Sequence, residues 1–192
     1  MRKVLSAIIL IAVAMSLNSC SYNSMVKMDE NVKGKWGEVQ TQYQRRSDLI
    51  PNLVATVKGQ ANFEQKTLTD VTEARAKATS MQVDPTKLTP ESIKQYQAAQ
   101  GQLGGALTRL MVASENYPNL KSNEAFNTLQ AQLEGTENRI GIARKDFNEA
   151  VQEYNGKIRS FPANLTAKMF GFAPKGYFAA EAGSDKAPKV AF

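Results

Sequence analysis

The 192-residue sequence has no histidine and only one cysteine, Cys20. Without histidine, the chain cannot form catalytic triads or dyads with a histidine base, histidine-ligated zinc sites or the Glu-x-x-His sites of di-metal helical bundles. A single cysteine cannot form an internal disulfide. An enzymatic mechanism would have to use carboxylates, lysine, tyrosine or serine alone. The sequence therefore predicts a protein that is not an enzyme, with no catalytic residue, cofactor or metal.

The sequence also has little clustered charge. Of its formal net charge of +6, Arg2 and Lys3 contribute two, so residues 20–192 carry 22 basic and 18 acidic side chains, a net charge of +4. Beyond this leader, the only adjacent basic pairs are at residues 45–46 and 144–145. Nucleic-acid-binding domains usually have a clustered basic stripe and a known motif. We therefore expect no nucleic acid partner.

No apolar run near the N-terminus is long enough to span a bilayer comfortably. Residues 4–17 are apolar apart from two serines, and 14 helical residues extend only about 21 Å, against about 30 Å of hydrocarbon. That length, after Arg2 and Lys3, is typical of a signal peptide. The run Leu-Asn-Ser-Cys at residues 17–20 resembles a bacterial lipobox, which makes Cys20 the expected lipid attachment site.

These features predict that residues 1–19 form a lipoprotein-type signal peptide or a short membrane anchor. An uncleaved anchor with an incidental Cys20 and a simple secreted protein both stay open as alternatives. The expected location is the bacterial cell envelope, with the protein tethered to a membrane and facing the periplasm. The membrane is thus the first expected partner, held through lipid or through the N-terminal anchor.

From residue 22 onward, apolar residues recur every three or four positions, the spacing of amphipathic helices. Trp36 lies in the first apolar stripe and is expected to be buried. Asp48 and Pro51 suggest a break at residues 47–51, because aspartate caps helices and proline is tolerated in a first turn. Thr89 and Pro90 form a helix start signal after a linker at residues 81–89. Further helices are expected at about 51–80, 90–115 and 122–160.

The predicted fold class is therefore all-α, an antiparallel up-and-down bundle of three to four long helices behind the N-terminal segment. The bundle is expected to occupy residues 20–180, followed by a flexible C-terminal tail at residues 181–192.

Three polar or glycine-rich clusters are candidate sites. Arg45, Arg46 and Asp48 suit either the ends of two helices or an anion or partner site, and the dipole argument favours helix ends. Glu134, Glu137 and Arg144 form the densest polar cluster, for which solvated pairs three or four residues apart are the default. Gly101, Gly104 and Gly105 lack the context of a phosphate loop and suggest helix packing or chance.

Several runs resemble the LemA family, and the resemblance covers residues 22–178. The longest are Gln-Arg-Arg-Ser-Asp-Leu-Ile-Pro-Asn-Leu-Val at 44–54 and Leu-Glu-Gly-Thr-Glu-Asn-Arg-Ile at 133–140. Shorter matches are Tyr-Asn-Ser-Met-Val at 22–26, Glu-x-Tyr-Pro-x-Leu-Lys at 115–121 and Tyr-Phe at 177–178. The resemblance implies a helical bundle behind a membrane segment and no particular activity. Many relatives have a longer anchor, so lipidation at Cys20 would here replace a spanning helix.

The C-terminal region 161–178 carries an apolar stripe with nearby lysines. Its candidate surface residues are Phe161, Leu165, Lys168, Met169, Phe170 and Phe172. In an up-and-down bundle this region lies beside the start of the first helix, and so near the membrane. Two interpretations stay open. The aromatic residues either close the end of the bundle and are buried, or they enter the lipid interface with lysines over anionic headgroups.

The functional hypothesis is a membrane-anchored, non-catalytic envelope protein that acts as an interaction or scaffolding module, with another envelope protein as partner. The alternative is a lipid- or membrane-surface-binding protein that uses residues 161–178.

Overall fold

The computed structural model describes the backbone of residues 2–59 and 63–180, and the side chains of residues 21–59 and 63–180. Within these residues the chain is all-α, as predicted, with no strand. Four long helices and two short ones follow one another: α1 (Arg2–Lys58), α2 (Gln65–Ser80), α3 (Pro90–Ser114), α4 (Pro118–Lys121), α5 (Glu124–Arg159) and α6 (Ala163–Phe170).

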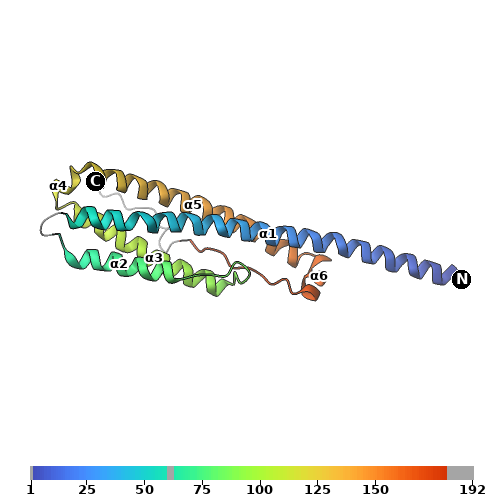
Figure 1. Cartoon of the computed structure of the whole chain (residues 1–192). Helices are drawn as coiled ribbons and strands as arrows, with labels where there is room; N and C mark the ends of the chain where they lie inside the picture. Colours follow the sequence, from blue (N-terminus) through green and yellow to red (C-terminus); the bar gives the residue numbers. More distant parts are fainter. Residues whose placement is uncertain (1, 60–62, 181–192) are drawn as a thin grey trace, which may run out of the picture.

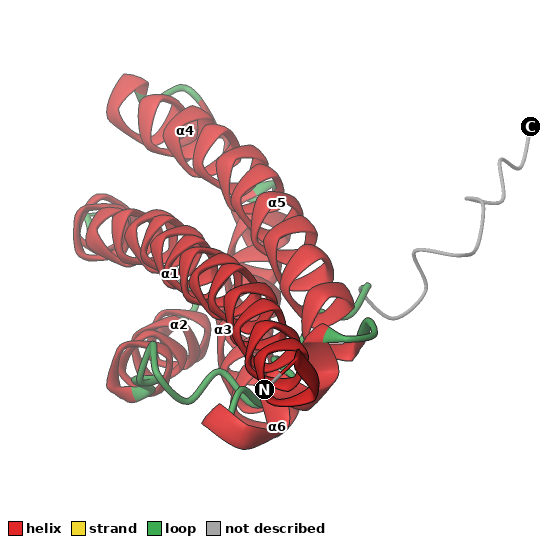
Figure 2. Ribbon diagram, turned by 90° about the vertical axis from the view of Figure 1, so that its right-hand side faces the viewer, coloured by secondary structure: helices red, strands yellow, loops and turns green. Residues whose placement is uncertain are grey.

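The long helices alternate in direction (Figure 1), which confirms the up-and-down bundle. α1 packs along α5, and α2 packs along α3. Seen from its N-terminal end (Figure 2), the bundle has α6 at the near end, beside α1. α1 extends beyond the other helices at this end (Figure 1). The start of the first helix and the end of the fourth therefore lie side by side, as the topology predicts.

The bundle interior has two apolar clusters. The one nearer α6 is rich in aromatic residues and is built around Trp36, which is fully buried as predicted. The Trp36 ring packs edge-on against Tyr96, with ring centroids 5.0 Å apart, and also contacts Phe147. The other cluster is mainly aliphatic and joins the far ends of α1, α3 and α5 to α2. Leucine and valine side chains dominate there.

The predicted break at residues 47–51 is wrong, because α1 continues through Pro51 as far as Lys58. Proline has no N–H, so the carbonyl of Ser47, four residues earlier, loses its usual helical donor. The Arg75 side chain of α2 replaces that donor: its Nε donates to the Ser47 carbonyl at 2.9 Å. Ile50 and Leu53, on either side of the proline, are buried. Tertiary contacts thus keep the helix intact.

The limits of α3 and α5 agree with the sequence. The single helix expected at about 51–80 is wrong, because residues 51–58 complete α1 and α2 begins at Gln65. Thr89 caps α3 by accepting a hydrogen bond from the Ser92 N–H, with Pro90 as the first helical residue. Asn123 caps α5 in the same way, accepting from the Phe126 N–H. Side-chain oxygens at these positions satisfy N–H groups that have no partner within the helix. The linker at 81–89 separates α2 from α3 as expected.

After α6 the chain runs back over the bundle as an extended segment, residues 172–180, which we call the C-terminal strap. Amide side chains bind its backbone in pairs of hydrogen bonds. Asn155 Nδ2 donates to the Lys175 carbonyl while Oδ1 accepts from the Lys175 N–H, both at 2.9 Å. Asn148 binds the backbone of Phe178 in the same way. An extended segment outside a sheet has no neighbouring strand to pair with its backbone N–H and C=O groups, and these amide side chains take that role.

Some predictions fall outside the described residues. The backbone of α1 is helical back to Arg2. The side chains of the predicted signal segment 1–19 and of Cys20 are not among those that the structure describes. The predicted tail at 181–192 lies outside it as well. Within residues 21–59 and 63–180, no helix is both long and apolar enough to cross a membrane.

Candidate functional site

Arg46 links three helices at the centre of the bundle. Its guanidinium, on α1, donates to Glu137 Oε2 on α5 at 2.8 Å. On α3, Arg46 Nη2 donates to the Gln100 carbonyl at 3.1 Å and to Gln100 Oε1 at 3.0 Å. Arg46 is 3% exposed, whereas the Glu137 side chain is 54% exposed. Because the guanidinium is always charged and offers donors in a fixed fork, it suits a buried junction of this kind.

Two tyrosines complete this junction. The Arg46 guanidinium lies over the Tyr43 ring, 5.0 Å from its centroid, and Tyr43 packs edge-on against Tyr96. Burial, reinforced by neighbouring Tyr43, raises the pKa of Tyr96 well above its usual value. Its phenol therefore stays protonated near neutral pH and is not a general base. The junction holds helices together and offers no acid–base pair.

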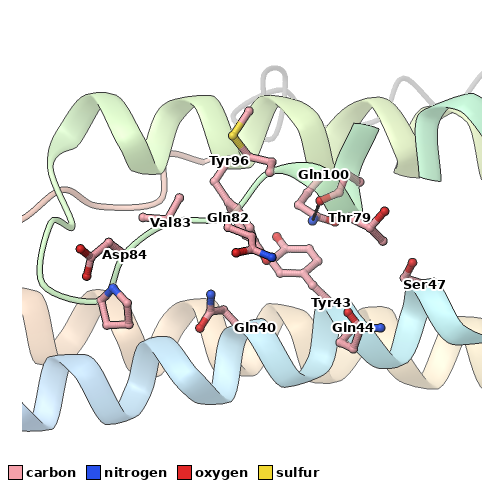
Figure 3. Close-up of a pocket in the computed structure, with 13 residues that line it drawn as sticks. Gln40, Tyr43, Gln44, Ser47, Thr79, Gln82, Val83, Asp84, Tyr96 and Gln100 are labelled. Atoms are coloured by element: carbon pink, nitrogen blue, oxygen red, sulfur yellow. Dashed lines mark hydrogen bonds between the residues drawn. The ribbon is translucent and has the colours of Figure 1, made fainter. Parts of the chain in front are cut away.

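A pocket of about 540 Å³ lies on the linker side of this junction, between α1 and residues 81–85. In Figure 3, Gln40 and Tyr43 point from α1 toward Gln82 on the linker. The lining is mostly amides and hydroxyls, and its one charged side chain, Asp84, accepts hydrogen bonds from Thr86. Such a pocket can bind neutral polar groups but has no nucleophile paired with a base.

A larger groove of about 800 Å³ lies between α3 and α5, and we call it the α3–α5 groove. Arg46 and Tyr43 contribute to its lining, and Ala179 and Ala180 of the strap also border it. The remaining lining residues are Lys94, Gln97, Ala98, Gln100, Gly101, Gly104, Gly105, Leu107, Thr108 and Met111 of α3, and Gln130, Leu133, Glu134, Glu137 and Arg144 of α5.

The three glycines of α3 all line this groove. A Cβ added at Gly101 would meet no atom within 4 Å, and one at Gly104 would reach only Arg46 Nη1, at 3.8 Å. Gly101 therefore has open space in front of it, and a neighbouring helix does not pack there. Glycine costs a helix about 1 kcal/mol of stability relative to alanine. At Gly101 no contact with a neighbouring helix offsets that cost. The glycines instead leave the groove wide.

The polar clusters behave differently from the sequence prediction. Arg45 and Asp48 are exposed within α1 rather than at a helix end, and Asp48 accepts a hydrogen bond from Gln44. The helix-end interpretation is therefore wrong, since α1 does not end there. Glu137 is not in a solvated pair on its own helix, because its partner is the buried Arg46 of α1. Glu134 does have a local partner, Gln130.

The candidate surface at residues 161–172 gathers at the end of the bundle. Phe161 is 82% exposed, Met169 70%, Leu165 60% and Phe170 55%, and Lys168 is exposed as well. Phe172 is half-buried.

The same surface meets the start of the bundle part of α1. The Tyr22 ring lies 4.8 Å from the Phe170 ring and 5.7 Å from the Phe172 ring, measured between centroids. Farther along, Phe178 is buried between Trp36 and Phe147. Region 161–178 therefore contains a helix whose large side chains are exposed and a strap that buries Phe178 but leaves Tyr177 46% exposed.

Among residues 21–59 and 63–180, no group of three or more cysteine, aspartate or glutamate side chains is placed to hold a metal ion. One carboxyl with a shifted pKa, Asp29, lies in an ion cluster that anchors the strap. Asp29 pairs with Lys175 at 2.8 Å and with Lys33 at 2.7 Å. Burial raises the pKa of Asp29, but the hydrogen bonds from Lys175 and Lys33 outweigh it and lower the pKa overall.

Sequence reasoning missed Gln100, Asn148 and Asn155, the amides that bind backbone or Arg46. Gln100 takes a stripe position between Tyr96 and Leu103, and Asn148 and Asn155 directly follow stripe residues; all three are buried or half-buried. A polar residue at a stripe position is the signal that marks such roles, because buried amides need partners.

Three relatives align with most of the chain. Magnetosome protein MamQ 2 of Paramagnetospirillum magneticum is 28% identical over 174 residues, 82% of this chain and 64% of the relative. Magnetosome protein MamQ of Magnetospirillum gryphiswaldense is 27% identical over the same shares. Protein LemA of Metamycoplasma hominis is 23% identical over 76% of this chain and 63% of its own. The chain thus spans somewhat less than two thirds of these relatives' length.

The sequence model of the LemA family matches residues 35–192. This range contains both long runs that meet at the Arg46 junction. The chain belongs to the LemA family.

Proposed function

We propose that this protein is a membrane-anchored, non-catalytic interaction module of the bacterial cell envelope. The observation that carries the proposal is the α3–α5 groove, which is wide, largely preformed and close to the Arg46 junction. Residues 4–17 supply the anchor, and Cys20 is the proposed lipid attachment. The names of the three relatives state no enzymatic activity.

The proposed occupant of the groove is an extended, largely apolar segment of another envelope protein. The groove already shows how an extended chain is bound at one end. Gln97 Nε2 donates to the Ala179 carbonyl at 2.9 Å, and Gln97 Oε1 accepts from the Ala179 N–H at 3.0 Å. Arg144 also donates to the Ala179 carbonyl, at 2.9 Å. Side chains along the walls can continue this backbone recognition, as in other modes of peptide binding.

The groove offers both charged and apolar side chains to such a segment. Lys94 and Arg144 lie near the bound strap, and Glu134 and Glu137 line the α5 wall. Leu107, Leu133 and Met111 supply apolar contact. The Arg46 junction ties α1, α3 and α5 together, so the walls do not have to be assembled on binding. A preformed site keeps more of its interaction energy as affinity.

The test places a photocrosslinking benzoylphenylalanine at Thr108 in the groove of the full chain, in intact cells. The control carries the same residue at Lys66, which is exposed on α2. A second pair of variants separates specific binding from chance. Gly101→Trp fills the groove, whereas Gly141→Trp adds the same bulk to the exposed side of α5, where a Cβ also meets nothing.

We expect one defined envelope protein to crosslink at Thr108 and not at Lys66. Gly101→Trp is expected to abolish the crosslink, and Gly141→Trp to leave it unchanged. A crosslink that survives Gly101→Trp would contradict the proposal. A crosslink from Thr108 to residues 181–192 of the same chain would also contradict it, because the groove would then hold the protein's own C-terminal residues.

A further inference from the structure

Helix α6 exposes its large side chains and buries its small ones. Ala163, Thr166 and Ala167 face the bundle and are no more than 3% exposed. On the other side Leu165 and Met169, four residues apart, share one helical face, and Phe161 lies in the turn just before α6. These three side chains are 60–82% exposed.

This arrangement is the reverse of the one that water favours. Burying a side chain such as leucine, methionine or phenylalanine is favourable, and large contiguous apolar patches are uncommon on soluble surfaces. The alanines on the inner face of α6 are explained by packing, since small residues let a helix approach its neighbours closely. Packing within the bundle does not explain the large apolar side chains on the outer face. A second apolar environment outside the protein accounts for it.

The position of α6 identifies that environment. The rings of Tyr22 and Phe170 are in contact, with centroids 4.8 Å apart. Leu17, the last residue of the apolar run, precedes Tyr22 by five residues, or about 7.5 Å of helix. The interfacial layer on each side of the hydrocarbon core is roughly 5–8 Å thick. A chain tethered through residues 4–17 or through lipid on Cys20 therefore holds α6 at the level of the headgroups.

The charge at this end of the bundle fits an anionic surface. Residues 154–180 contain no aspartate or glutamate, and residues 21–28 contain none either. Lys168 is exposed on α6, and Arg159 is exposed at the end of α5. Lys27 adds an exposed positive charge on α1. Basic residues beside an anionic bilayer are attracted to its headgroups.

We infer that the exposed face of α6 docks into the headgroup and acyl boundary of an anionic bilayer, beside the N-terminal tether. Phe161, Leu165, Met169 and Phe170 enter the boundary, and Lys168 and Arg159 contact anionic headgroups. Amphipathic helices with this pattern lie in the plane of the interface. A second contact beside the tether fixes how the bundle stands on the membrane. The inference rests on the proposed anchor but not on the groove.

The experiment uses the full chain in vesicles of phosphatidylcholine and phosphatidylglycerol whose acyl chains are brominated to quench tryptophan. Phe170→Trp places a reporter on α6, and Val112→Trp places the matched control at an exposed apolar position near the far end of α3. The emission of buried Trp36 is measured in the unaltered chain and subtracted. Flotation of the vesicles reports anchoring separately.

We expect the Phe170→Trp reporter to be quenched and blue-shifted, and the Val112→Trp reporter to show neither change. Vesicles of phosphatidylcholine alone should quench the α6 reporter less. Adding Leu165→Glu and Met169→Glu should abolish quenching while leaving flotation and thermal unfolding unchanged, because both positions are exposed.

Other outcomes overturn the inference. Protein that floats with an unquenched α6 reporter keeps its anchor but does not dock α6. Protein that does not float at all overturns both the anchor and the docking of α6. A reporter that is shielded only in native envelope, and not in pure lipid, would show that another protein covers α6.

Discussion

The segment made of α6 and the turn before it and the C-terminal strap are neighbours in the sequence, and both carry aromatic residues, yet they place them differently. Phe161 in that turn and Phe170 of α6 face outward, whereas the strap turns Phe178 into the core, where it is 4% exposed. The difference follows from their backbones. A helix satisfies its own hydrogen bonds and contacts the bundle through one narrow face. The extended strap has its backbone bound by Asn148 and Asn155, which brings it close enough to insert a ring.

The comparison shows that an aromatic stripe does not by itself indicate a core. What separates the two segments is whether the bundle offers polar partners to the backbone. Asn148 and Asn155 do so for the strap. α6, whose backbone is hydrogen-bonded within the helix, lies at the end of the bundle and packs against it through the small side chains of Ala163 and Ala167.

Removing the strap's ring should have the largest effect. Phe178→Ala deletes a side chain that stacks on Trp36 and packs edge-on against Phe147. We expect a loss of about 3–5 kcal/mol in the free energy of unfolding, as for other buried phenylalanines. Phe161→Ala, its counterpart in the turn before α6, should change stability by no more than about 0.5 kcal/mol. Urea unfolding of both variants measures the difference, and equal losses would erase the distinction between the two segments.

A smaller effect is expected where the strap crosses the start of α3. A Cβ at Gly176 would lie 2.6 Å from the Pro90 Cα, and the Gly176 N–H donates to the Leu88 carbonyl at 2.9 Å. Because the obstacle is backbone, Gly176→Ala should displace the strap and cost about 1–3 kcal/mol. Gly101→Ala, where the Cβ meets nothing, should instead stabilise the chain by up to about 1 kcal/mol. Thermal unfolding distinguishes the two, and a stabilising Gly176→Ala would show that the strap is loosely held.

The smallest expected effect concerns the ion cluster under the strap. Asp29→Asn removes the partner of Lys175, which is 7% exposed. We expect a loss of about 1 kcal/mol at neutral pH. Glu30→Gln, which alters only a surface pair with Lys33, should have a smaller effect.

The pH dependence of that effect has a definite sign. The pKa of Asp29 is lower in the folded state than its ordinary value of 3.8. The carboxylate therefore contributes its full stabilisation above that ordinary value and loses it as pH falls through the folded pKa. The stability gap between Asp29→Asn and the unaltered chain should stay constant above about pH 5 and close at lower pH. Unfolding curves between pH 7 and pH 2.5 test this, and a gap that widens in acid would contradict the assignment.

Local sequence signals predicted the limits of α3 and α5 because the relevant interactions are local. The Thr89 cap and the start at Pro90 depend on neighbouring residues, and α3 begins there. The predicted break at 47–51 failed for the opposite reason. The donor that rescues the Ser47 carbonyl is Arg75, 28 residues away. No local pattern reveals such a partner.

The candidate sites follow the same division. Arg46 was noticed in the sequence, but its role as a buried junction depends on Glu137, 91 residues away. The glycines of α3 were noticed as well, but only the separation of α3 and α5 makes them the open wall of a groove. The exposure of α6 was one of two alternatives that the apolar stripe left open.

The sequence by itself determined the helical class, the burial of Trp36, the limits of α3 and α5 and the family, because periodicity, caps and long runs are properties of neighbouring residues. The tertiary structure decided the continuity of α1 through Pro51, the pairing of Arg46 with Glu137 and the opposite fates of α6 and the strap. Each of these depends on which polar group reaches which backbone or charge across the bundle. That is a matter of distance in space and not of spacing along the chain.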